Sequence, residues 1–483
     1  MILTHLQGWL LDDNACRCIL VEVQAFNGQE EVTLYLSNRN YITTKDEVPE
    51  HTAYLPCITE VAPLIEKMDI DGAASLSLGE ISLSNHAGDI TDWLGWIFDN
   101  RPIKVFIGDL NWPRSQFEVI YEGIVATLQV KSNELFALPV TDKLQRLNGA
   151  INEELDDADE TLPMCFGEVS NIKPKLIDPV NLRYQVHTRK ISGIIEVRDR
   201  GLPVNFSVNV DEATFQLGSK PFGEVTCSVW GDTNPHYHDT PTEIIKQIVT
   251  GFGPEPLTPE ELDNESLDEF ALKTNKCIGV YIDERSNILN VIREIAFSVG
   301  GSVCTSADGK LRLIQVEAPE TLQYVMELDE NNIAENSFRI LSKLDVMTSL
   351  KLGYNRNYAP DSELSVGMPT EHQKQFDGEW KYVKVKDDSL IALYRHTEEP
   401  VPQYTHLQVR SEALAECQRW FDIFKTQRFI FSIEGYEELL QLELGDVIHL
   451  LHRKFGFHNG RNAMVIGLAK NWSNGTVRVE FLA

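Results

Sequence analysis

Apolar and polar side chains alternate along most of the first 150 residues, which is the pattern of strands with one buried face. The alternation runs through residues 19–25 and 32–36, and the pair Asn27-Gly28 between them is typical of a tight hairpin turn. At residues 90–98 the apolar spacing becomes that of a helix, with Asp89 in position to cap it. This segment is therefore predicted to be strands, one amphipathic helix and further strands.

The middle of the chain changes from strands to a mixture of helices and strands. Residues 164–230 continue the alternation, whereas Thr240-Pro241 begins a helical pattern with a capping box and a proline at its first position. A second helical stripe covers residues 288–299, and a strand pair follows it. Residues 254–270 are acidic and interrupted by prolines, so we expect an exposed loop between the two helices.

The last segment has one strong helical pattern between runs of alternation. Ser411 is in position to begin this helix, and the apolar stripe continues to Phe424. Trp420 and Phe421 lie on the stripe, so at least one of them is expected to be buried against the next strand, residues 429–433. A final Asn-Gly pair predicts a closing hairpin.

The tetrapeptide Asn-Arg-Asn-Tyr follows an alternating run at residues 38–41 and again at residues 355–358. Both outer segments also have the order strands, one helix, strands. This order predicts that residues 15–150 and 330–483 superpose as β-barrel-like domains, each with one flanking helix. The alternative is an accident of composition, because β-rich domains with one covering helix are common.

A chain of 483 residues is too long for a single hydrophobic core. We predict a mainly β fold with α+β insertions, divided into four domains. Residues 1–150 and 327–483 are the two barrel-like domains with their flanking helices, residues 151–235 form a β-rich hub domain, and residues 236–326 form a small α/β domain.

The charge of the chain is unusual, with 73 acidic and 43 basic residues and a formal net charge of -30. Such a surface repels nucleic acid and anionic membranes. One interpretation is solubility. The other is a surface past which a polyanion must move without being held.

Eight cysteines are scattered along the chain without a Cys-x-x-Cys pair, so most are expected to be reduced core residues. The N-terminal apolar run has no basic start and is interrupted by Asp12 and Asp13, which is not typical of a signal peptide. No apolar stretch is long enough for a membrane helix. We expect a soluble protein that is made in a cytoplasm.

Two stretches carry side chains with possible binding chemistry. His236, His238 and Asp239 are metal-ligand types, but they lie just before a helix and lack a third, distant motif, so we predict loop residues and no metal. The basic stretch at residues 450–462 contains Phe455 and could touch nucleic acid. In an acidic chain, we favour a charged loop that meets an acidic neighbour.

Motifs for a catalytic serine, a phosphate loop or a zinc protease are absent from the sequence. Acidic residues are so numerous that spacing alone nominates no pair of carboxylates as a glycosidase site. No catalytic residue, cofactor site or metal site is assigned, and the chain is predicted not to be an enzyme.

Seven stretches resemble the tail hub proteins of long-tailed bacteriophages, which are related to the trimeric baseplate hubs of contractile tails. In chain order they are YLSNRNYIT, LSNHAGDITDWLGWIFDNRPIKVFIGD, CFGEVSNIKPKLIDPVNLRYQVH, VRDRGLPV, FGEVTCSVWG, LGYNRNY and LELGDVIHLLHRKFG. They extend over nearly the whole chain and keep the order of the family. They are structural signatures and not catalytic ones.

The resemblance implies two barrel domains similar to a tail-tube subunit, so that three chains present six similar positions to a sixfold tube. It implies a structural hub of a phage tail tip or baseplate, which adapts the tube to the tip proteins and lines the DNA channel. The expected partners are two further copies of the chain, the tail tube or distal tail protein ring, and tip, spike or fibre proteins, with transient contact to passing DNA. The expected location is the virion tail, assembled in the host bacterial cytoplasm.

The chain departs from some relatives of this family. It lacks the closely placed cysteines that hold an iron–sulfur cluster in flexible tails, so no cluster is carried over. Nothing in it matches the lysozyme or peptidase domain of others. The alternatives are a tail-associated hydrolase that acts on cell wall or surface polysaccharide, and a carbohydrate-binding adhesin.

Overall fold

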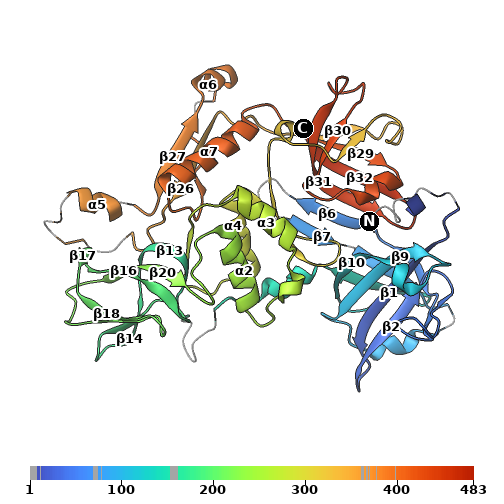
Figure 1. Ribbon diagram of the computed structural model, residues 1–483, viewed down its shortest axis with the longest axis horizontal. Helices are drawn as coiled ribbons and strands as arrows, with labels where there is room; N and C mark the ends of the chain where they lie inside the picture. The colour runs from blue at the N-terminus through green and yellow to red at the C-terminus, as the bar shows by residue number, and fades with distance from the viewer. Residues whose placement is uncertain are drawn as a thin grey trace. The chain divides into compact units, whose positions relative to one another are not determined.

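The computed structural model describes residues 8–483, except residues 11, 13, 69–73, 78, 87, 153–160, 361–363, 366, 367, 369, 377, 397 and 398. The described residues are mainly β-strands with α+β portions, so the predicted fold class is confirmed (Figure 1). They divide into two compact units: Met1–Arg146, Val303–Asp345 and Gln427–Ala483 form the first, and Leu147–Ser302 and Val346–Thr426 form the second. The four-domain division is finer than this and stays a prediction.

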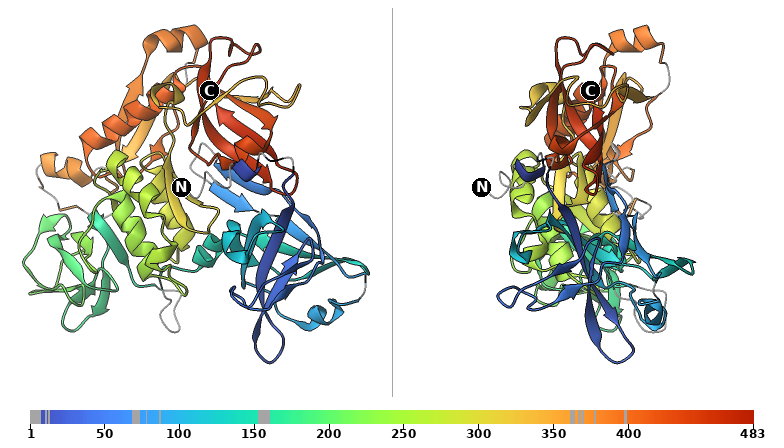
Figure 2. Two further views of the ribbon diagram at one scale, coloured as in Figure 1. Left: turned by 45° about the vertical axis from the view of Figure 1, so that its right-hand side comes forward. Right: turned by 90° about the vertical axis from the view of Figure 1, so that its right-hand side faces the viewer.

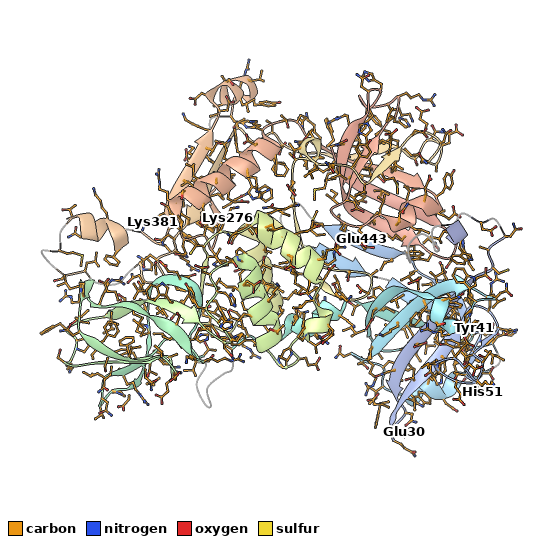
Figure 3. The ribbon with its side chains drawn as sticks, viewed as in Figure 1. Glu30, Tyr41, His51, Lys276, Lys381 and Glu443 are labelled. Carbon is orange, nitrogen blue, oxygen red and sulfur yellow. The ribbon has the colours of Figure 1, made fainter. Side chains whose placement is uncertain are left out.

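The N-terminal segment of the first unit forms an antiparallel sheet with the order β2-β1-β9-β10-β12-β8-β5. Its strands are β1 (Arg17–Phe26), β2 (Glu31–Ser37), β5 (Ile58–Val61), β8 (Gly79–Ser84), β9 (Pro102–Asp109), β10 (Glu118–Val125) and β12 (Leu135–Thr141), with β11 (Gln129–Ser132) paired to β12. The β1–β2 hairpin extends beyond the other strands of this sheet in both views of Figure 2, and Glu30 lies at its tip (Figure 3). Its turn contains Gly28 at φ 96°, as the Asn-Gly pair predicts.

Backbone hydrogen bonds from one short segment join the two edges of this sheet. Ser37 N donates to Leu55 O at 2.8 Å, and Leu55 N donates to Tyr35 O at 2.8 Å, both from the edge strand β2. Two residues further along, Cys57 O accepts from Ser84 N at 2.7 Å, at the opposite edge. The segment then continues as β5, so it links both edges of the sheet in a barrel-like arrangement, which we call the first barrel.

The C-terminal segment of the first unit forms a second sheet with the order β24-β30-β31-β32-β29-β25. Its strands are β24 (Met326–Leu328), β25 (Arg339–Lys343), β29 (Phe429–Gly435), β30 (Val447–Leu450), β31 (Arg461–Asn471) and β32 (Thr476–Leu482). A single stretch of chain, residues 326–343, occupies both edges of this sheet. It pairs with β30 through β24 and with β29 through β25, and between them Ala334 N donates to Glu434 O at 2.8 Å. These strands are the second barrel.

A hairpin from the N-terminal segment pairs with the second barrel. Strand β6 (Leu64–Met68) runs antiparallel to β31, and β7 (Ala74–Ser77) pairs with β6 (Figure 1). One continuous cluster of buried side chains includes Val21 and Val105 of the first barrel and Val465 and Phe481 of the second. The two barrels therefore share a core and one strand connection, although they come from opposite ends of the chain.

The second unit contains smaller sheets and most of the helices. Its strands are β13 (Met164–Ile172), β14 (Lys175–Asp178), β15 (Arg183–Gln185), β16 (Ile191–Asp199), β17 (Leu202–Pro203), β18 (Phe206–Asn209), β19 (Thr214–Leu217), β20 (Val225–Asp232), β21 (Gly279–Ile282), β26 (Ser349–Tyr354), β27 (Lys381–Lys386) and β28 (Gln403–Tyr404). Its α-helices are α2 (Pro241–Gly251), α3 (Asn264–Lys273), α4 (Ile288–Phe297), α5 (Thr370–Phe376), α6 (Asp388–Tyr394) and α7 (Arg410–Phe424).

Several short elements complete the described residues. Strands β3 (Tyr41–Ile42) and β4 (Ala53–Tyr54) pair with each other, as do β22 (Gly301–Thr305) and β23 (Leu311–Gln315). The 3-10 helices are η1 (Thr91–Gly95), η2 (Arg114–Gln116), η3 (Lys143–Asn148), η4 (Pro259–Glu261), η5 (Pro319–Thr321) and η6 (Glu437–Gln441). No described helix is long and apolar enough to cross a membrane.

Both predicted flanking helices need correction. The expected helix at residues 90–98 is only the short η1, because Ile97 forms backbone hydrogen bonds with Phe26 and so continues as extended chain. The second helix forms as α7, and Trp420 and Phe421 are buried as expected. However, the main contacts of α7 are with β26 and β27 of its own unit, in place of the expected strand at residues 429–433.

The repeated tetrapeptide does not mark a repeated structure. Residues 38–41 follow β2 of the first barrel, whereas residues 355–358 follow β26, which belongs to a three-stranded sheet of the second unit. The strand orders of the two barrels nevertheless agree. Strands β9-β10-β12-β8-β5 of the first and β30-β31-β32-β29-β25 of the second follow one another in the same chain order and are antiparallel throughout, with β1 and β24 next to β9 and β30. The tetrapeptide therefore belongs to no repeat, but the common strand order bears out the expectation that the two outer segments repeat one arrangement, and their superposition stays a prediction.

Candidate functional site

Two features of the described residues are suited to assembly with other proteins: the joined barrels of the first unit and an aromatic loop in the second unit. The joint between the barrels is fixed by a buried ion pair on neighbouring strands. Glu66 on β6 and Lys470 on β31 lie 3.0 Å apart, and each side chain is 6% exposed. If either charge lost its partner, the other would be buried and unpaired, at a large cost in free energy. The ion pair therefore disfavours any other register of β6 on β31.

The aromatic loop lies between β19 and β20. Its most prominent side chain is Phe222, which is 92% exposed. The backbone that carries Phe222 is held by Asp199 at the end of β16: Phe222 N donates to Asp199 Oδ2 at 2.7 Å and Gly223 N donates to Asp199 Oδ1 at 2.9 Å. Because Asp199 is itself buried, these two bonds hold the loop in one conformation.

The neighbouring hairpin supports this loop. Strands β16 and β17 are joined by Arg200 and Gly201, which have φ values of 50° and 77°, the signature of a two-residue hairpin turn. The side chain of Arg200 lies across Gly223, where an added Cβ would be 2.4 Å from Arg200 Cγ. Glycine is therefore required at position 223 for the hairpin and the loop to lie together.

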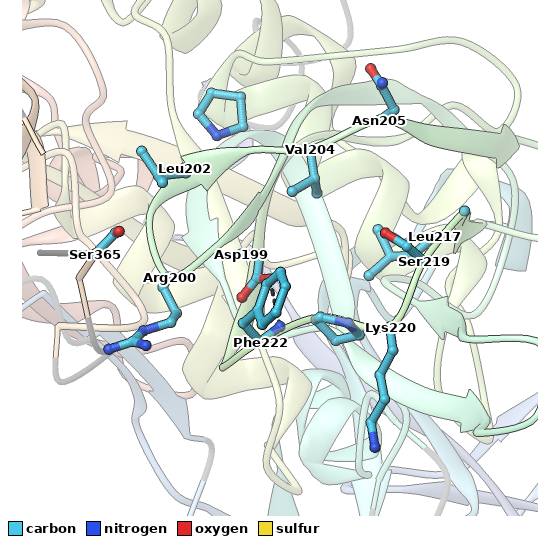
Figure 4. A pocket seen from close by; sticks show the side chains of 13 residues that line it. Asp199, Arg200, Leu202, Val204, Asn205, Leu217, Ser219, Lys220, Phe222 and Ser365 are labelled. Carbon is cyan, nitrogen blue, oxygen red and sulfur yellow. Dashed lines mark hydrogen bonds between the residues drawn. The ribbon is translucent and has the colours of Figure 1, made fainter.

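A groove of about 760 Å³ lies between the hairpin and the loop. Its walls include Leu202 and Val204 on the apolar side, and Arg200 and Lys220 lie on opposite sides of Phe222 (Figure 4). The carboxylate of Asp199 is occupied by backbone N–H groups. The groove thus offers an apolar floor, one exposed aromatic ring and basic groups at its rim. We call it the Phe222 groove.

The most enclosed polar cluster of the second unit is built for stability. His187 and Asp232 are both fully buried, and His187 Nε2 lies 2.9 Å from Asp232 Oδ2. The backbone N–H of Cys165 donates to His187 Nδ1 at 3.0 Å, so Nε2 carries the proton and the ring is neutral. Burial lowers the pKa of His187, in keeping with this state.

Cysteine, histidine and aspartate can form the catalytic triad of a hydrolase, but the geometry of this cluster does not fit a catalytic triad. The Cys165 Sγ atom points to Val186 O and not to the ring of His187. Burial also raises the pKa of Cys165 far above its usual range, which keeps it a thiol. The cluster therefore offers a substrate neither access nor an activated nucleophile.

The structure also places the two stretches with possible binding chemistry. Asp239, in the histidine-rich stretch, accepts the backbone N–H of Ile278 through its carbonyl oxygen and lies beside Cys277. Among the residues that the structure describes, no group of three histidine, cysteine or acidic side chains could hold a metal ion.

The basic stretch at residues 450–462 is a packed loop of the second barrel. Phe457 is fully buried among the rings of Phe338, Phe431 and Phe481. Arg453 Nε lies 3.6 Å from Glu330 Oε1, so the loop meets an acidic neighbour as expected.

Sequence reasoning did not single out the Phe222 groove as a site. Most of one wall lies in the stretch VRDRGLPV, and Phe222 is the first residue of the stretch FGEVTCSVWG; both stretches carry part of the family resemblance. The Arg-Gly pair between alternating runs was a signal for the hairpin turn. Nothing in the sequence indicated that Asp199 would reach the second stretch, because that contact spans more than twenty residues.

No protein-family model and no curated protein matches the chain. Solved structures that are similar include a tail protein from Neisseria meningitidis MC58, at 9% identity and a TM-score of 0.42 over 97% of this chain and 96% of that chain. A 43 kDa tail protein of prophage MuSo2 from Shewanella oneidensis has 10% identity and a TM-score of 0.41, over 96% of this chain and 98% of that chain. Prophage tail protein gp18 from Listeria monocytogenes EGD-e has 10% identity and a TM-score of 0.35, over 96% of this chain and 94% of that chain. Each of the three is described as a tail protein.

Proposed function

We propose that this chain is a non-enzymatic structural hub of a phage tail tip or baseplate. The observation that carries the proposal is that one chain builds two barrels from its two ends and joins them through β6 and β31. Three such chains present six barrels, which suits a ring that adapts a sixfold tail tube to a threefold tip. The resemblance of the sequence to tail hub proteins supports the same role.

The joint between the barrels gives the ring its spacing. A strand shared between the barrels, a continuous core and an enclosed ion pair hold them at a fixed distance within one chain. Around a ring of six barrels, two neighbouring barrels belong alternately to the same chain and to two different chains. A regular ring therefore needs a fixed distance between the two barrels of each chain. On this account the hub contacts the tail tube or distal tail ring on one face and tip, spike or fibre proteins on the other, within the virion tail.

The ring predicts a specific mass in solution. We expect the purified chain to form a homotrimer, three times the 54.7 kDa of the monomer, in native mass spectrometry and in sedimentation over a range of concentrations. A threefold ring is expected because three chains with two barrels each match a sixfold tube, and contacts between unlike surfaces form a ring when the rotation between copies closes. A stable dimer or an open series of higher oligomers would contradict the proposal.

The ring is also proposed to line the channel through which DNA leaves. The net charge of -30 supports this part, because fixed lysine or arginine on a channel wall would hold each phosphate and release its counterions. We expect the purified oligomer to bind duplex DNA weakly at low salt. Binding that is tight, and that falls by roughly 10³–10⁵ between 50 and 200 mM salt as for proteins with 6–10 phosphate contacts, would contradict it.

A further inference from the structure

We propose that one face of the small sheet β27-β26-β28 binds a neutral polysaccharide, with sugar rings stacked on the aromatic rings of Trp380 and Tyr404. We call the surface formed by Trp380, Tyr382 and Tyr404 the aromatic face. It lies entirely in the second unit. Binding of a sugar chain there is an activity beyond the structural role of a hub.

The alternation of side chains along β26 places the aromatic face away from helix α7. Leu352 is buried on the side of the sheet that α7 covers (Figure 1). The next residue, Gly353, points to the other side, opposite Tyr382 and beside Tyr404. An added Cβ at Gly353 would lie 2.9 Å from Tyr404 Cδ1 and 3.3 Å from Trp380 Cε3. Both rings therefore lie directly on the backbone of β26.

The rings of the aromatic face are exposed and held in place. Tyr404 is 49% exposed and Tyr382 is 42% exposed. The ring centroids of Trp380 and Tyr404 are 4.8 Å apart. Lys351 Nζ lies 4.3 Å from the centroid of the Tyr382 ring, and Arg356 Cζ lies 5.4 Å from that of Trp380. Rings that are ordered before a ligand arrives lose little conformational freedom on binding.

The charges beside the rings are balanced, which favours a neutral ligand. Arg356 Nε donates to Glu379 Oε1 at 2.9 Å. Lys384 Nζ lies 2.7 Å from Glu399 Oε2, and the hydrogen bond from Lys384 and the positive charge of Lys351 lower the pKa of Glu399. A polyanion would gain little from cations that already have carboxylate partners. A cationic ligand would meet Lys351 and Arg356 already beside the ring faces.

A sugar chain matches the chemistry of the aromatic face better than a protein segment does. A pyranose ring presents C–H groups on one side, which the negative face of an aromatic ring attracts. Its hydroxyl groups can form hydrogen bonds with the hydroxyls of Tyr382 and Tyr404 and with the Glu379 carboxylate. By contrast, a protein partner would remove water from the ion pairs beside the rings, and charged residues are depleted at the cores of protein interfaces.

The direct test is a titration of the full chain with defined oligosaccharides, followed by tryptophan fluorescence and by saturation-transfer NMR. The neutral probes are maltohexaose, cellohexaose and chitohexaose, and the charged probes are a hyaluronan hexasaccharide and a single-stranded DNA. We expect at least one neutral probe to bind and to receive saturation from aromatic protons of the protein. Binding of none of the three at millimolar concentration, or tighter binding of a charged probe, would overturn the inference.

Three variants locate the site. Tyr404→Ala removes the most exposed ring and should weaken binding of the neutral probe roughly tenfold, the effect of losing one aromatic contact. Tyr404→Phe keeps the ring and should retain most of the affinity. Tyr436→Ala is the matched control, because Tyr436 is 47% exposed and lies in the first unit.

The variants also separate this inference from the proposed function. Equal binding by Tyr404→Ala and Tyr436→Ala, with both variants melting like the parent, would show that the sugar binds elsewhere and that the inference is wrong. The hub proposal is unaffected by either outcome, because these measurements do not depend on assembly.

Discussion

Replacing Trp420 and Phe421 together by alanine is expected to destabilise the second unit severely. Both side chains are buried on α7, and the Trp420 ring stacks on Phe424 with centroids 5.3 Å apart. The helix covers β26 and β27, so the truncations would leave a cavity between helix and sheet. Truncating one large buried aromatic residue costs about 3–5 kcal/mol, and the double change should exceed either single one.

Thermal melting followed by circular dichroism would measure this loss. The matched control is Gln418→Ala, because Gln418 is exposed on the same helix and its truncation should change stability by no more than about 0.5 kcal/mol. Melting of the double variant at the temperature of the parent would mean that α7 packs on nothing.

Replacing Lys470 by methionine is expected to destabilise the first unit by about 3–5 kcal/mol, because Glu66 is then left as an enclosed charge without its partner. The ion pair is 3.0 Å long and almost fully covered. The loss should appear in denaturant unfolding as a lower midpoint. It should also release β6 from β31, which amide hydrogen exchange of residues 64–68 would detect.

A second change separates the ion pair from simple packing. Combining Lys470→Met with Glu66→Leu removes both charges, and replacing a buried ion pair by apolar groups is often neutral or stabilising. We therefore expect the double variant to recover most of the stability that the single variant loses. A double variant less stable than Lys470→Met alone would show that the pair does not couple the two strands.

Local turn chemistry made several elements predictable from the sequence. Asn27-Gly28, Asp308-Gly309 and the final Asn-Gly pair each join two antiparallel strands, because glycine adopts the positive φ that these turns require. The helices α4 and α7 were equally clear, since each has a long apolar stripe at helical spacing.

Residues 254–270 were not predicted correctly. The expected exposed loop contains η4 and α3, because Asp263 accepts the backbone N–H of Ser266 and so caps the helix, and Leu267 and Phe270 are buried beneath it. Leu267 and Phe270 are the two buried apolar residues of α3, and a stripe of two is too weak to stand out among so many acidic neighbours.

Contacts between distant segments were beyond sequence reasoning. The pairing of β6 with β31 joins residues about four hundred positions apart, and neither strand has a pattern that identifies its partner. The link between the sheet edges through Leu55 likewise depends on a few backbone bonds outside regular strands. Alternation predicts that strands exist, whereas their order depends on tertiary packing. For the same reason, the sequence stretches VRDRGLPV and FGEVTCSVWG did not predict the Phe222 groove.

Cryo-electron microscopy of the purified oligomer would test the central claim most directly. The account predicts a threefold ring in which the two barrels of each chain occupy alternate positions, so that six barrels surround a central channel at similar radii. A ring of another order, or a threefold particle whose two barrels lie at different heights without forming one layer, would contradict the hub proposal.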